Sequence, residues 1–298
     1  MAKSEIYKPI QARVTSKSPM KLRADFLKRI FKDKRAVVCI LFLFIVSIVG
    51  IFAPIIAPFD PEELFYDSIL EAPNKEHLLG TDAIGRDLLS RLIYGVRVTL
   101  TVSLLAVAIT FFLGTFIGLV CAYVGGWVDN VLMRIMDILL ALPSIILALA
   151  IVAILGPSLT NAMIAVGVAS IPGFARLIRG AALTIKSSMF VEASRSIGSS
   201  HSWILRRQFL PNVTGILLVY TTLFIGVAIL DTAALSFIGL GAQPPTPEWG
   251  TMLSEGRNYM QNAWWLATFP GIAITMVVFA VNFLGDALRD IFDPKSSG

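Results

Sequence analysis

The chain has 298 residues, of which 56% are hydrophobic and 15% charged, with a mean hydropathy of +0.76. This composition is typical of membrane proteins and excludes a soluble single-domain protein. The formal net charge of +5 does not indicate nucleic-acid binding, because the basic residues border apolar runs, as cytoplasmic flanks of membrane proteins do.

The chain begins with a basic segment. Residues 1–19 lack periodicity and are expected to be disordered in the cytoplasm. From residue 20, apolar residues recur at helical spacing opposite lysines and arginines, which favours either an amphipathic helix in the headgroup region or a simple basic flank. The apolar run that follows has no cleavage site beyond it and is expected to remain as an anchor.

Six apolar runs are each close to the length that crosses a bilayer, about 20 residues for about 30 Å of hydrocarbon. They lie at residues 36–56, 100–122, 131–155, 159–175, 213–235 and 264–284. We therefore predict an all-α integral membrane protein with six transmembrane helices. Its predicted parts are an N-terminal tail with an amphipathic helix (1–35), a six-span domain (36–285) and a C-terminal tail (286–298).

The charges predict the orientation of these spans. Residues 59–99 carry mostly acidic side chains, whereas the N-terminal tail, residues 176–212 and the C-terminal tail carry most of the lysines and arginines. Because lysine- and arginine-rich segments stay in the cytoplasm, both termini and residues 176–212 are predicted to be cytoplasmic. Residues 59–99 are then extracytoplasmic.

The extracytoplasmic segment contains the stretch Leu-Gly-Thr-Asp-Ala-Ile-Gly-Arg-Asp at residues 79–87, followed by leucines at helical spacing. Thr81 or Asp82 is predicted to cap that helix, and Asp82 to pair with Arg86 one turn later. Structural capping is favoured over ligand contact. Calcium binding is disfavoured because the acidic residues do not alternate as in an EF-hand loop.

Polar and small residues mark particular faces of the spans. Gly114 and Gly118 form a G-x-x-x-G pattern, which predicts close packing of a neighbouring helix. Arg134 and Asp137, three residues apart, are expected to neutralise one another, and Pro143 to kink the third span.

The fifth span carries an acid without a basic neighbour in the sequence, Asp231. Asn161 and Asn282 are the other polar groups of interest at membrane depth. Such side chains usually face protein or water, and only sometimes a substrate. Asp231 is therefore our candidate for a residue of a transport pathway.

Residues 239–250, between the fifth and sixth spans, are rich in glycine and proline. Thr246 is placed as an N-cap and Pro247 as the first residue of a short helix that could dip into the outer leaflet. Trp264 and Trp265 follow where an interfacial aromatic belt is expected.

Residues 191–212 form a polar, basic island between two apolar regions. Two short amphipathic helices joined at Gly198 are predicted, with Pro211 opening the next apolar run. Their apolar faces are Phe190, Val191 and Ile197 before the glycine, and Trp203, Ile204 and Phe209 after it. We interpret the island as the place where a soluble motor acts on a membrane pore; the alternative is a loop anchored at the membrane interface.

The chemistry of an enzyme is missing. The two histidines, His77 and His201, are predicted to lie on opposite sides of the membrane and cannot share a catalytic dyad or a metal site. The two cysteines lie in apolar runs and supply no metal-ligand spacing. No G-x-x-x-x-G-K-[ST] or G-x-G-x-x-G motif occurs, so any ATP is hydrolysed elsewhere. An ion-coupled secondary transporter is the alternative class, but intramembrane acids are sparse.

The island resembles a known family. Glu192-Ala193-Ser194, Gly198 and Leu210-Pro211 are similar to the E-A-A, three residues, G and distant L-P pattern of binding-protein-dependent ATP-binding-cassette importer permeases. This chain departs from the pattern with Ser194 in place of the second alanine and Gln208 where isoleucine is usual.

Three further stretches resemble the C-type permease subunit of dipeptide, oligopeptide and nickel importers, and the dipeptide permease most of all. They are residues 79–87, residues 241–250 (Gly-Ala-Gln-Pro-Pro-Thr-Pro-Glu-Trp-Gly) and the ending with Gly285-Asp286, Leu288-Arg289-Asp290 and Asp293-Pro294. The resemblance implies the fold of a type I importer permease in a bacterial inner or cell membrane. The implied substrates are dipeptides or short peptides, with nickel or glutathione as alternatives.

The resemblance also implies partners: a B-type permease subunit in a heterodimer, two ATP-binding subunits that hold ATP and Mg, an extracytoplasmic substrate-binding protein and membrane lipid. It implies no cofactor or metal on this chain itself.

A coupling helix would dock in a groove of one ATPase, with apolar residues in the groove and Glu192 and Arg195 at its rim. The implied coupling residues are Phe190, Val191, Glu192, Ala193, Ser194, Gly198, Trp203, Ile204, Leu210 and Pro211. The implied contacts of the outer face, with the binding protein or a gate, are Gly80, Asp82, Arg86, Asp87, Gln243, Pro244, Pro245, Glu248 and Trp249.

Overall fold

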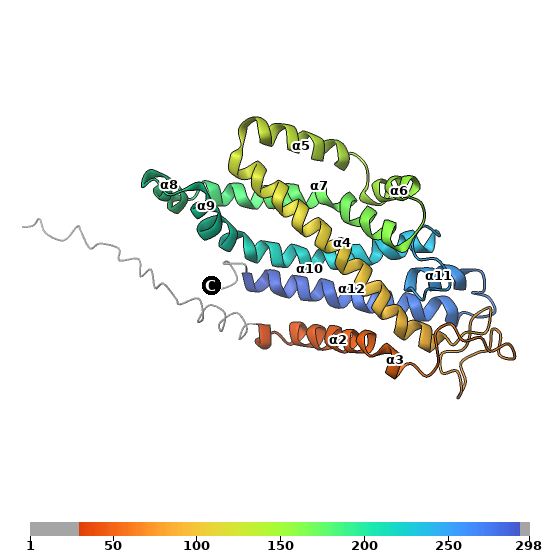
Figure 1. The fold of residues 1–298 in the computed structure, drawn as a ribbon. Helices are drawn as coiled ribbons and strands as arrows, with labels where there is room; N and C mark the ends of the chain where they lie inside the picture. The colour runs from red at the N-terminus through yellow and green to blue at the C-terminus, as the bar shows by residue number, and fades with distance from the viewer. Residues whose placement is uncertain (1–29, 293–298) are drawn as a thin grey trace, which may run out of the picture.

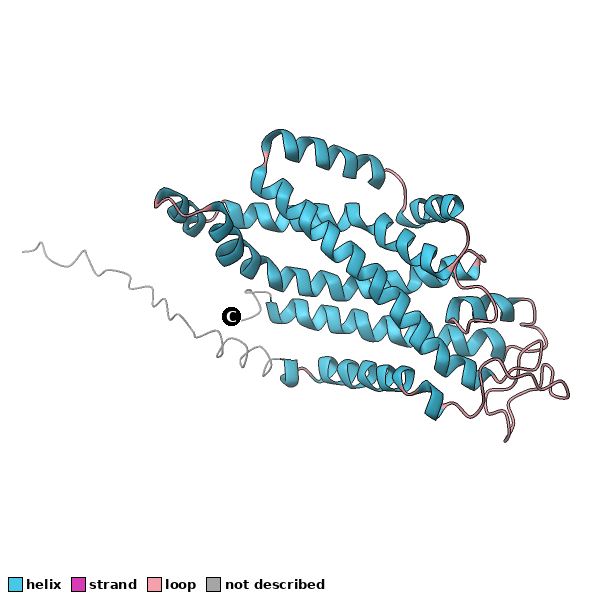
Figure 2. Cartoon of the chain, viewed as in Figure 1, coloured by secondary structure: helices cyan, strands magenta, loops and turns pink. Residues whose placement is uncertain are grey.

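The structure, a computed structural model, describes residues 30–292 as an elongated bundle of helices (Figure 1). The expected amphipathic helix from residue 20 lies almost wholly outside the described residues. Figure 2 shows helices joined by loops, and the described residues form no named strand, only an isolated bridge between Thr81 and Asp87. The helices are α2 (Lys34–Ile51), α3 (Ala53–Ile56), α4 (Leu88–Val124), α5 (Gly126–Leu140), α6 (Ser144–Leu155), α7 (Leu159–Lys186), α8 (Met189–Ser196), α9 (His201–Ile204), a π-helical turn (Leu205–Phe209), α10 (Leu210–Phe237), α11 (Trp249–Arg257) and α12 (Trp265–Phe292).

Among the described residues, five helical stretches are long and apolar enough to cross a membrane: α2, α4, α7, α9 with α10, and α12. Most extend past the predicted spans. Helix α4 starts at Leu88 instead of residue 100, and α7 continues to Lys186 instead of ending at 175. Helix α12 runs to Phe292, through residues predicted as the start of the C-terminal tail. A hydrophobicity pattern marks the apolar window, whereas the helix itself continues as far as its backbone hydrogen bonds do.

The predicted third span is present as two helices, which together are long and apolar enough to be a sixth crossing among the described residues. Helices α5 and α6 are separate and meet at 89°. The break falls at Pro143, which has ψ of 139° and precedes the first residue of α6. Proline lacks the N–H that would continue α5, and it disfavours helical geometry in the residue before it, so the chain turns here.

Helices α4 and α7 cross closely, as the G-x-x-x-G pattern predicts. A Cβ on Gly114 would lie 2.9 Å from the Phe174 ring, and one on Gly118 would lie 2.6 Å from the Ala175 carbonyl oxygen. From the other side, a Cβ on Gly167 of α7 would lie 2.9 Å from the Ala106 carbonyl oxygen. Small residues on both helices therefore allow backbone contact, which confirms the predicted packing face.

Helix α5 is held on α7 by ion pairs. Asp129 accepts from Nε and Nη2 of Arg179, both at 2.5 Å, and Asp137 pairs with Arg176. The predicted pair of Arg134 with Asp137 is wrong, because Asp137 faces the arginine of the neighbouring helix instead.

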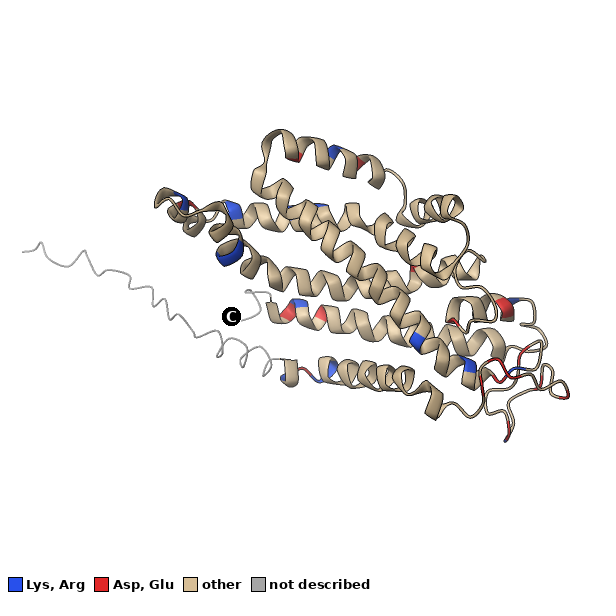
Figure 3. Ribbon diagram, viewed as in Figure 1, with Lys and Arg blue, Asp and Glu red and all other residues tan. Residues whose placement is uncertain are grey.

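The bundle has two distinct ends. We call them the α8 end, where α8 and α9 project and where α2 begins and α12 finishes, and the α11 end, where the 57–87 segment and α11 lie (Figure 1). In Figure 3, many of the acidic residues lie in the loops at the α11 end, and most of the length of the helices carries no charged residue.

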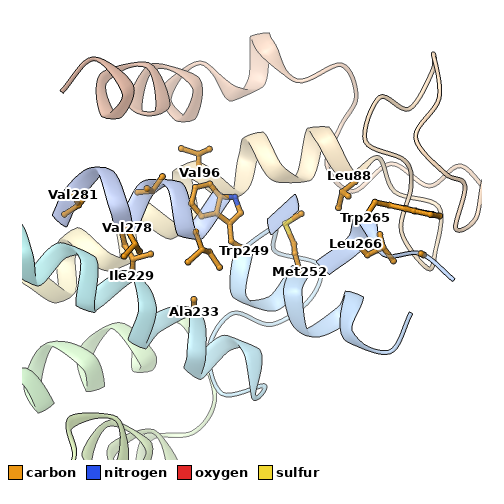
Figure 4. Packing of buried hydrophobic residues seen from close by; sticks show 13 residues of the cluster. Leu88, Val96, Ile229, Ala233, Trp249, Met252, Trp265, Leu266, Val278 and Val281 are labelled. Carbon is orange, nitrogen blue, oxygen red and sulfur yellow. The ribbon is translucent and has the colours of Figure 1, made fainter. Parts of the chain in front are cut away.

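A hydrophobic core anchors the α11 end (Figure 4). Trp249 is buried against α4, where Gly95 leaves room for its indole ring, and its Nε1 donates to the Leu92 carbonyl at 3.0 Å. Met252, Ile229 and Val278 belong to the same cluster. Helices α4, α10, α11 and α12 thus share one core.

Candidate functional site

The island forms a tight loop that links α7 to α10 at the α8 end. Ser188 precedes α8, and the Ser200 hydroxyl accepts from the Trp203 N–H at 3.4 Å to begin α9. Between them Gly198 has φ of +76°, a conformation that glycine adopts without strain. We refer to residues 187–209 as the α8–α9 loop. The glycine joint lies where the sequence predicts it, but the second helix is not separate, because α9 runs through the π turn into α10.

Two of the apolar residues expected to enter a partner's groove are instead inside this chain. Val191 is 0% exposed and Ile204 is 1% exposed, and with Phe209 they pack on Phe174 and Ile178 of α7. They are unavailable to a partner and serve to seat the loop on the bundle. The sequence pattern identifies an apolar face but not which molecule covers it.

The opposite face of the loop is exposed and partly apolar. Ile197 is 81% exposed, Trp203 is 46% and Phe190 is 45%. Glu192 and Ala193 are exposed beside them. An added Cβ on Gly198 would meet no atom of the described residues within 4 Å. The loop therefore presents apolar side chains and open space away from its own bundle.

The two residues that depart from the family pattern contact one another. The Gln208 side-chain amide donates to the Ser194 hydroxyl, and that hydroxyl donates to the Phe190 carbonyl at 2.9 Å. The Gln208 Nε2 also lies 3.4 Å from the Phe190 carbonyl oxygen. A polar link thus joins α8 to the π turn, where the usual pattern has two apolar residues. Leu210 and Pro211 follow as the first residues of α10.

Residues of α4 and α7 that the sequence did not single out support the loop. The Lys186 ammonium donates to the carbonyls of Ala122 at 2.7 Å and Tyr123 at 2.9 Å, which satisfies the end of α4. The Tyr123 hydroxyl bonds to His201, and its ring stacks edge-on against Phe209 at 5.5 Å. No local signal announces these contacts, because Tyr123 and His201 are 78 residues apart.

At the α11 end, Asp87 rather than Thr81 or Asp82 caps α4. The Asp87 carboxylate accepts from the Ser90 N–H at 2.8 Å and from its hydroxyl at 2.7 Å. Its other oxygen lies 3.0 Å from Nδ1 of buried His77. The predicted cap was wrong because the carboxylate of Asp82 is already used by its own turn, where it accepts from the N–H groups of Ile84 and Arg86.

The predicted Asp82–Arg86 pair is present at 2.6 Å and belongs to a larger network. Arg86 and Arg91, both buried, converge on Glu255 of α11 at 3.2 Å and 3.1 Å. A cavity of about 320 Å³ lies beside these four residues, with Tyr259 and Pro244 in its wall. The network ties the 57–87 segment to α11.

Residues 239–250 fold back onto the bundle. The N-cap of α11 is Glu248, which accepts from the Thr251 N–H at 2.9 Å, so the helix begins two residues later than the sequence predicts with Thr246 and Pro247. The Gln243 amide closes its own turn on the carbonyls of Gly239 and Gly241.

Among the residues expected to contact partners at this end, Gly80, Asp82, Arg86, Asp87, Glu248 and Trp249 are buried, and Gln243, Pro244 and Pro245 are exposed. Gly80 has φ of +83° and faces the Trp265 indole, whose Nε1 donates to the Thr81 carbonyl at 3.2 Å. Trp265 is therefore a core residue and not a member of the predicted aromatic belt, whereas Trp264 is exposed.

Asp231 lies in α10 and is half-buried, with no hydrogen bond or ion pair among the residues that the structure describes. Near it on α10, Val227 and Leu230 are exposed, and so is Ile238 just after the helix. Thr232 is turned inward and bonds to Ser103 of α4 at 3.3 Å. Within residues 30–292 no cluster of histidine, cysteine, aspartate or glutamate has the arrangement of a metal site.

Comparison with known protein families gives two matches along the chain. The family described as "Binding-protein-dependent transport system inner membrane component" matches residues 114–298. The family described as "N-terminal TM domain of oligopeptide transport permease C" matches residues 21–73.

Two curated relatives are similar over nearly their whole length. The glutathione transport system permease protein GsiD of Escherichia coli O157:H7 is 46% identical over 275 residues, 92% of this chain and 91% of that protein. The di/tripeptide transport system permease protein DppC of Pseudomonas aeruginosa (strain UCBPP-PA14) is 45% identical over 284 residues, 93% of each.

Among solved structures, the fold is similar to a chain of the inward-facing MetNI methionine ABC transporter. The TM-score is 0.56 at 24% identity, over 68% of this chain and 96% of that one. At this identity the likeness concerns the fold alone.

Proposed function

Because the chain belongs to the family of binding-protein-dependent transport system inner membrane components, and is thus a permease subunit of an ABC importer, we propose that it forms half of a pathway for short peptides. ATP is hydrolysed on separate ATP-binding subunits, which bind the ATP and Mg²⁺. The other half of the pathway is a B-type permease in a heterodimer. The chain lies in a bacterial inner membrane with both termini in the cytoplasm.

The main support for the coupling role is that the α8–α9 loop has one buried side and one exposed apolar side. Its inner side, with Val191 and Ile204, is buried against α7, and its outer side, with Phe190 and Trp203, is exposed. A loop that is rigidly seated on one side and apolar on the other suits docking into a groove of an ATP-binding subunit. Closure of the two ATPases on nucleotide would then move the loop, and α7 and α10 with it.

The opposite end suits a docking platform for the substrate-binding protein. The Arg86–Asp82 and Arg86–Glu255 pairs hold the 57–87 segment in place. Its exposed charged residues between 60 and 76 are Asp60, Glu62, Glu63, Asp67, Lys75, Glu71 and Glu76. This mostly acidic surface favours a binding protein whose docking face is basic, because complementary charges speed and orient association.

Asp231 is our candidate for the pathway itself. An unpaired carboxylate at membrane depth is costly in lipid, so it is expected to face water or a cation. The α-ammonium of a peptide is such a cation, and the proposed position is the interface with the B-type permease.

A pair of variants at Gly198 tests the coupling role. Gly198→Ala and Gly198→Trp both bear the strain of a positive φ, about 1–2 kcal/mol, but only tryptophan fills the open space beside the loop. In the complete importer reconstituted in liposomes, we expect Gly198→Ala to keep most ATP-dependent uptake and Gly198→Trp to abolish it. The peptide affinity of the binding protein should not change in either. Persistent uptake and coupled ATP hydrolysis in Gly198→Trp would exclude the coupling role.

The substrate is tested separately. In a strain that lacks the chain, restored uptake is measured with labelled dipeptides, glutathione and nickel. Restoration of dipeptide uptake is expected, and restoration of glutathione or nickel uptake alone would replace the proposed substrate while leaving the coupling role intact.

A further inference from the structure

Arg97 is a charged residue that belongs neither to the α8–α9 loop nor to the ion-pair network around Arg86 and Glu255. It is exposed on α4, nine positions after Leu88 and so about 13 Å along the helix at about 1.5 Å per residue. No hydrogen bond or ion pair joins it to any residue within 30–292. By contrast, Arg91, Arg176 and Arg179 each meet a carboxylate.

Arg97 lies at one end of a crevice between α2 and α4. The crevice has a volume of about 360 Å³, and its wall includes Ser47, Gly50, Leu100, Thr101 and Leu104 beside Arg97. The helices touch at Gly50, where an added Cβ would lie 2.9 Å from Val96. Gly50 itself lines the crevice, so the two helices approach one another closely beside it.

The crevice has a charged residue at one end, and its length is lined by Leu100 and Leu104 with the hydroxyl residues Ser47 and Thr101 beside them. Helices α2 and α4 run in opposite directions, so Gly50 and Arg97 mark its α11 end, and Ser47 and Leu104 lie deeper in the span. Thr101 and Leu104 are exposed along it. An amphiphile with an anionic head at Arg97 and an apolar tail along Leu100 and Leu104 matches this order.

Arg97 lies at a depth in the membrane where its charge favours an anionic partner. Ile55 and Ile56 lie beyond Gly50 toward the α11 end, and both are exposed apolar residues. The hydrocarbon region therefore extends past Arg97. A guanidinium at this depth is costly unless it reaches up to headgroup phosphates along its flexible stem.

We propose that the α2–α4 crevice binds one anionic phospholipid, with its phosphate on Arg97 and an acyl chain along Leu100 and Leu104. The charged group selects the headgroup, and the exposed apolar wall accommodates the chain. This site is independent of the peptide substrate and of the α8–α9 loop.

Native mass spectrometry of the delipidated importer complex tests the proposal. The complex is titrated with 1-palmitoyl-2-oleoyl-phosphatidylglycerol, with the diacylglycerol that has the same chains and no phosphate, and with inorganic phosphate. We expect the phosphatidylglycerol to bind at least about tenfold more tightly than the other two, because the diacylglycerol lacks the charge-assisted contact with Arg97 and inorganic phosphate lacks the apolar contact of the acyl chains.

Variants locate the site. Arg97→Gln should weaken phosphatidylglycerol binding about tenfold, and Arg97→Lys should keep most of it. The control is Arg257→Gln, because Arg257 is an exposed arginine on α11 whose guanidinium lies 5.4 Å from the Phe237 ring, away from the crevice. Equal lipid binding in Arg97→Gln and the parent complex would overturn the proposal, as would equal affinity for the neutral diacylglycerol.

A photocrosslinker in place of Thr101 identifies the occupant in the membrane. Crosslinks to phospholipid support the site. Crosslinks formed only with a second permease chain would show that protein covers the crevice, and the proposal would fail.

Discussion

The Ser194 hydroxyl joins α8 to the π-helical turn that leads into α10. It accepts from Gln208 and donates to Phe190. In the family pattern both Ser194 and Gln208 are replaced by apolar residues, so the two departures form one unit. Removal of either side chain breaks the hydrogen bond between Ser194 and Gln208 in a partly buried place, whereas removal of both leaves neither polar side chain there to lack that partner.

We expect Ser194→Ala to destabilise the complex by about 1–2 kcal/mol, and the double change Ser194→Ala with Gln208→Ile to recover about 1 kcal/mol of that loss. Thermal unfolding of the four members of this double-mutant cycle measures the coupling. Ser196→Ala is the matched control, because Ser196 is also on α8 but exposed and bonded only to the Glu192 carbonyl. Additive effects of the two changes would show that Ser194 and Gln208 do not act together.

Asp82 and Asp87 show why the cap of α4 was misplaced. Both are followed by a residue pattern that suits an N-cap, and a sequence alone does not show which carboxylate is free. In the structure Asp82 is used by its turn and by Arg86, so Asp87 is left to bind Ser90. Hydrogen bonds within the folded segment therefore determine which of the two aspartates caps α4.

At the scale of elements, the contact between α4 and α7 is the closest helix crossing that the sequence marked. Gly118 lies against the Ala175 carbonyl and the Ile178 side chain. There is no space for even one methyl group at Gly118 of α4. At Gly180 of α7, by contrast, an added Cβ would have no atom of residues 30–292 within 4 Å.

Gly118→Ala should therefore force α4 and α7 apart and cost about 1–3 kcal/mol, with a lower midpoint of thermal unfolding. Gly180→Ala, the matched control, should leave the midpoint unchanged or raise it, because alanine favours a helix by about 1 kcal/mol over glycine. Circular dichroism or a dye-based melt of the purified complex measures both. Equal effects of the two substitutions would contradict the packing argument.

At the scale of the whole molecule, the two ends of the bundle differ in chemistry. The α11 end has buried ion pairs and an acidic surface, and the α8 end has a projecting loop with exposed arginines at 206 and 207. This asymmetry is the basis for the proposed orientation, because basic segments are retained in the cytoplasm.

Cysteine labelling tests that orientation. Cys39 and Cys121 are buried and are first replaced by alanine. A cysteine at exposed Tyr66 should then react with a membrane-impermeant maleimide in intact spheroplasts, and a cysteine at exposed Met189 only after permeabilisation. The reverse pattern would invert the orientation, and labelling of both in intact spheroplasts would refute it.

The sequence by itself determined the membrane class, the approximate spans, the α4–α7 packing face, the glycine joint of the loop and the permease family. These follow from local properties: run length, charge, small-residue spacing and motif spacing. It did not separate α5 from α6 at Pro143, where it predicted only a kink. Nor did it show that Asp137 pairs with Arg176.

Only the tertiary structure decided which side of each amphipathic segment is already covered. Val191 and Ile204 are covered by the chain's own α7, so the docking face of the α8–α9 loop is narrower than its apolar pattern suggests. Arg86 pairs not only with Asp82, as the sequence predicts, but also with Glu255, which is 169 residues away in the chain. The pair therefore connects two distant segments. Such contacts depend on where the helices cross, and that is set by packing of the whole bundle rather than by any one stretch of sequence.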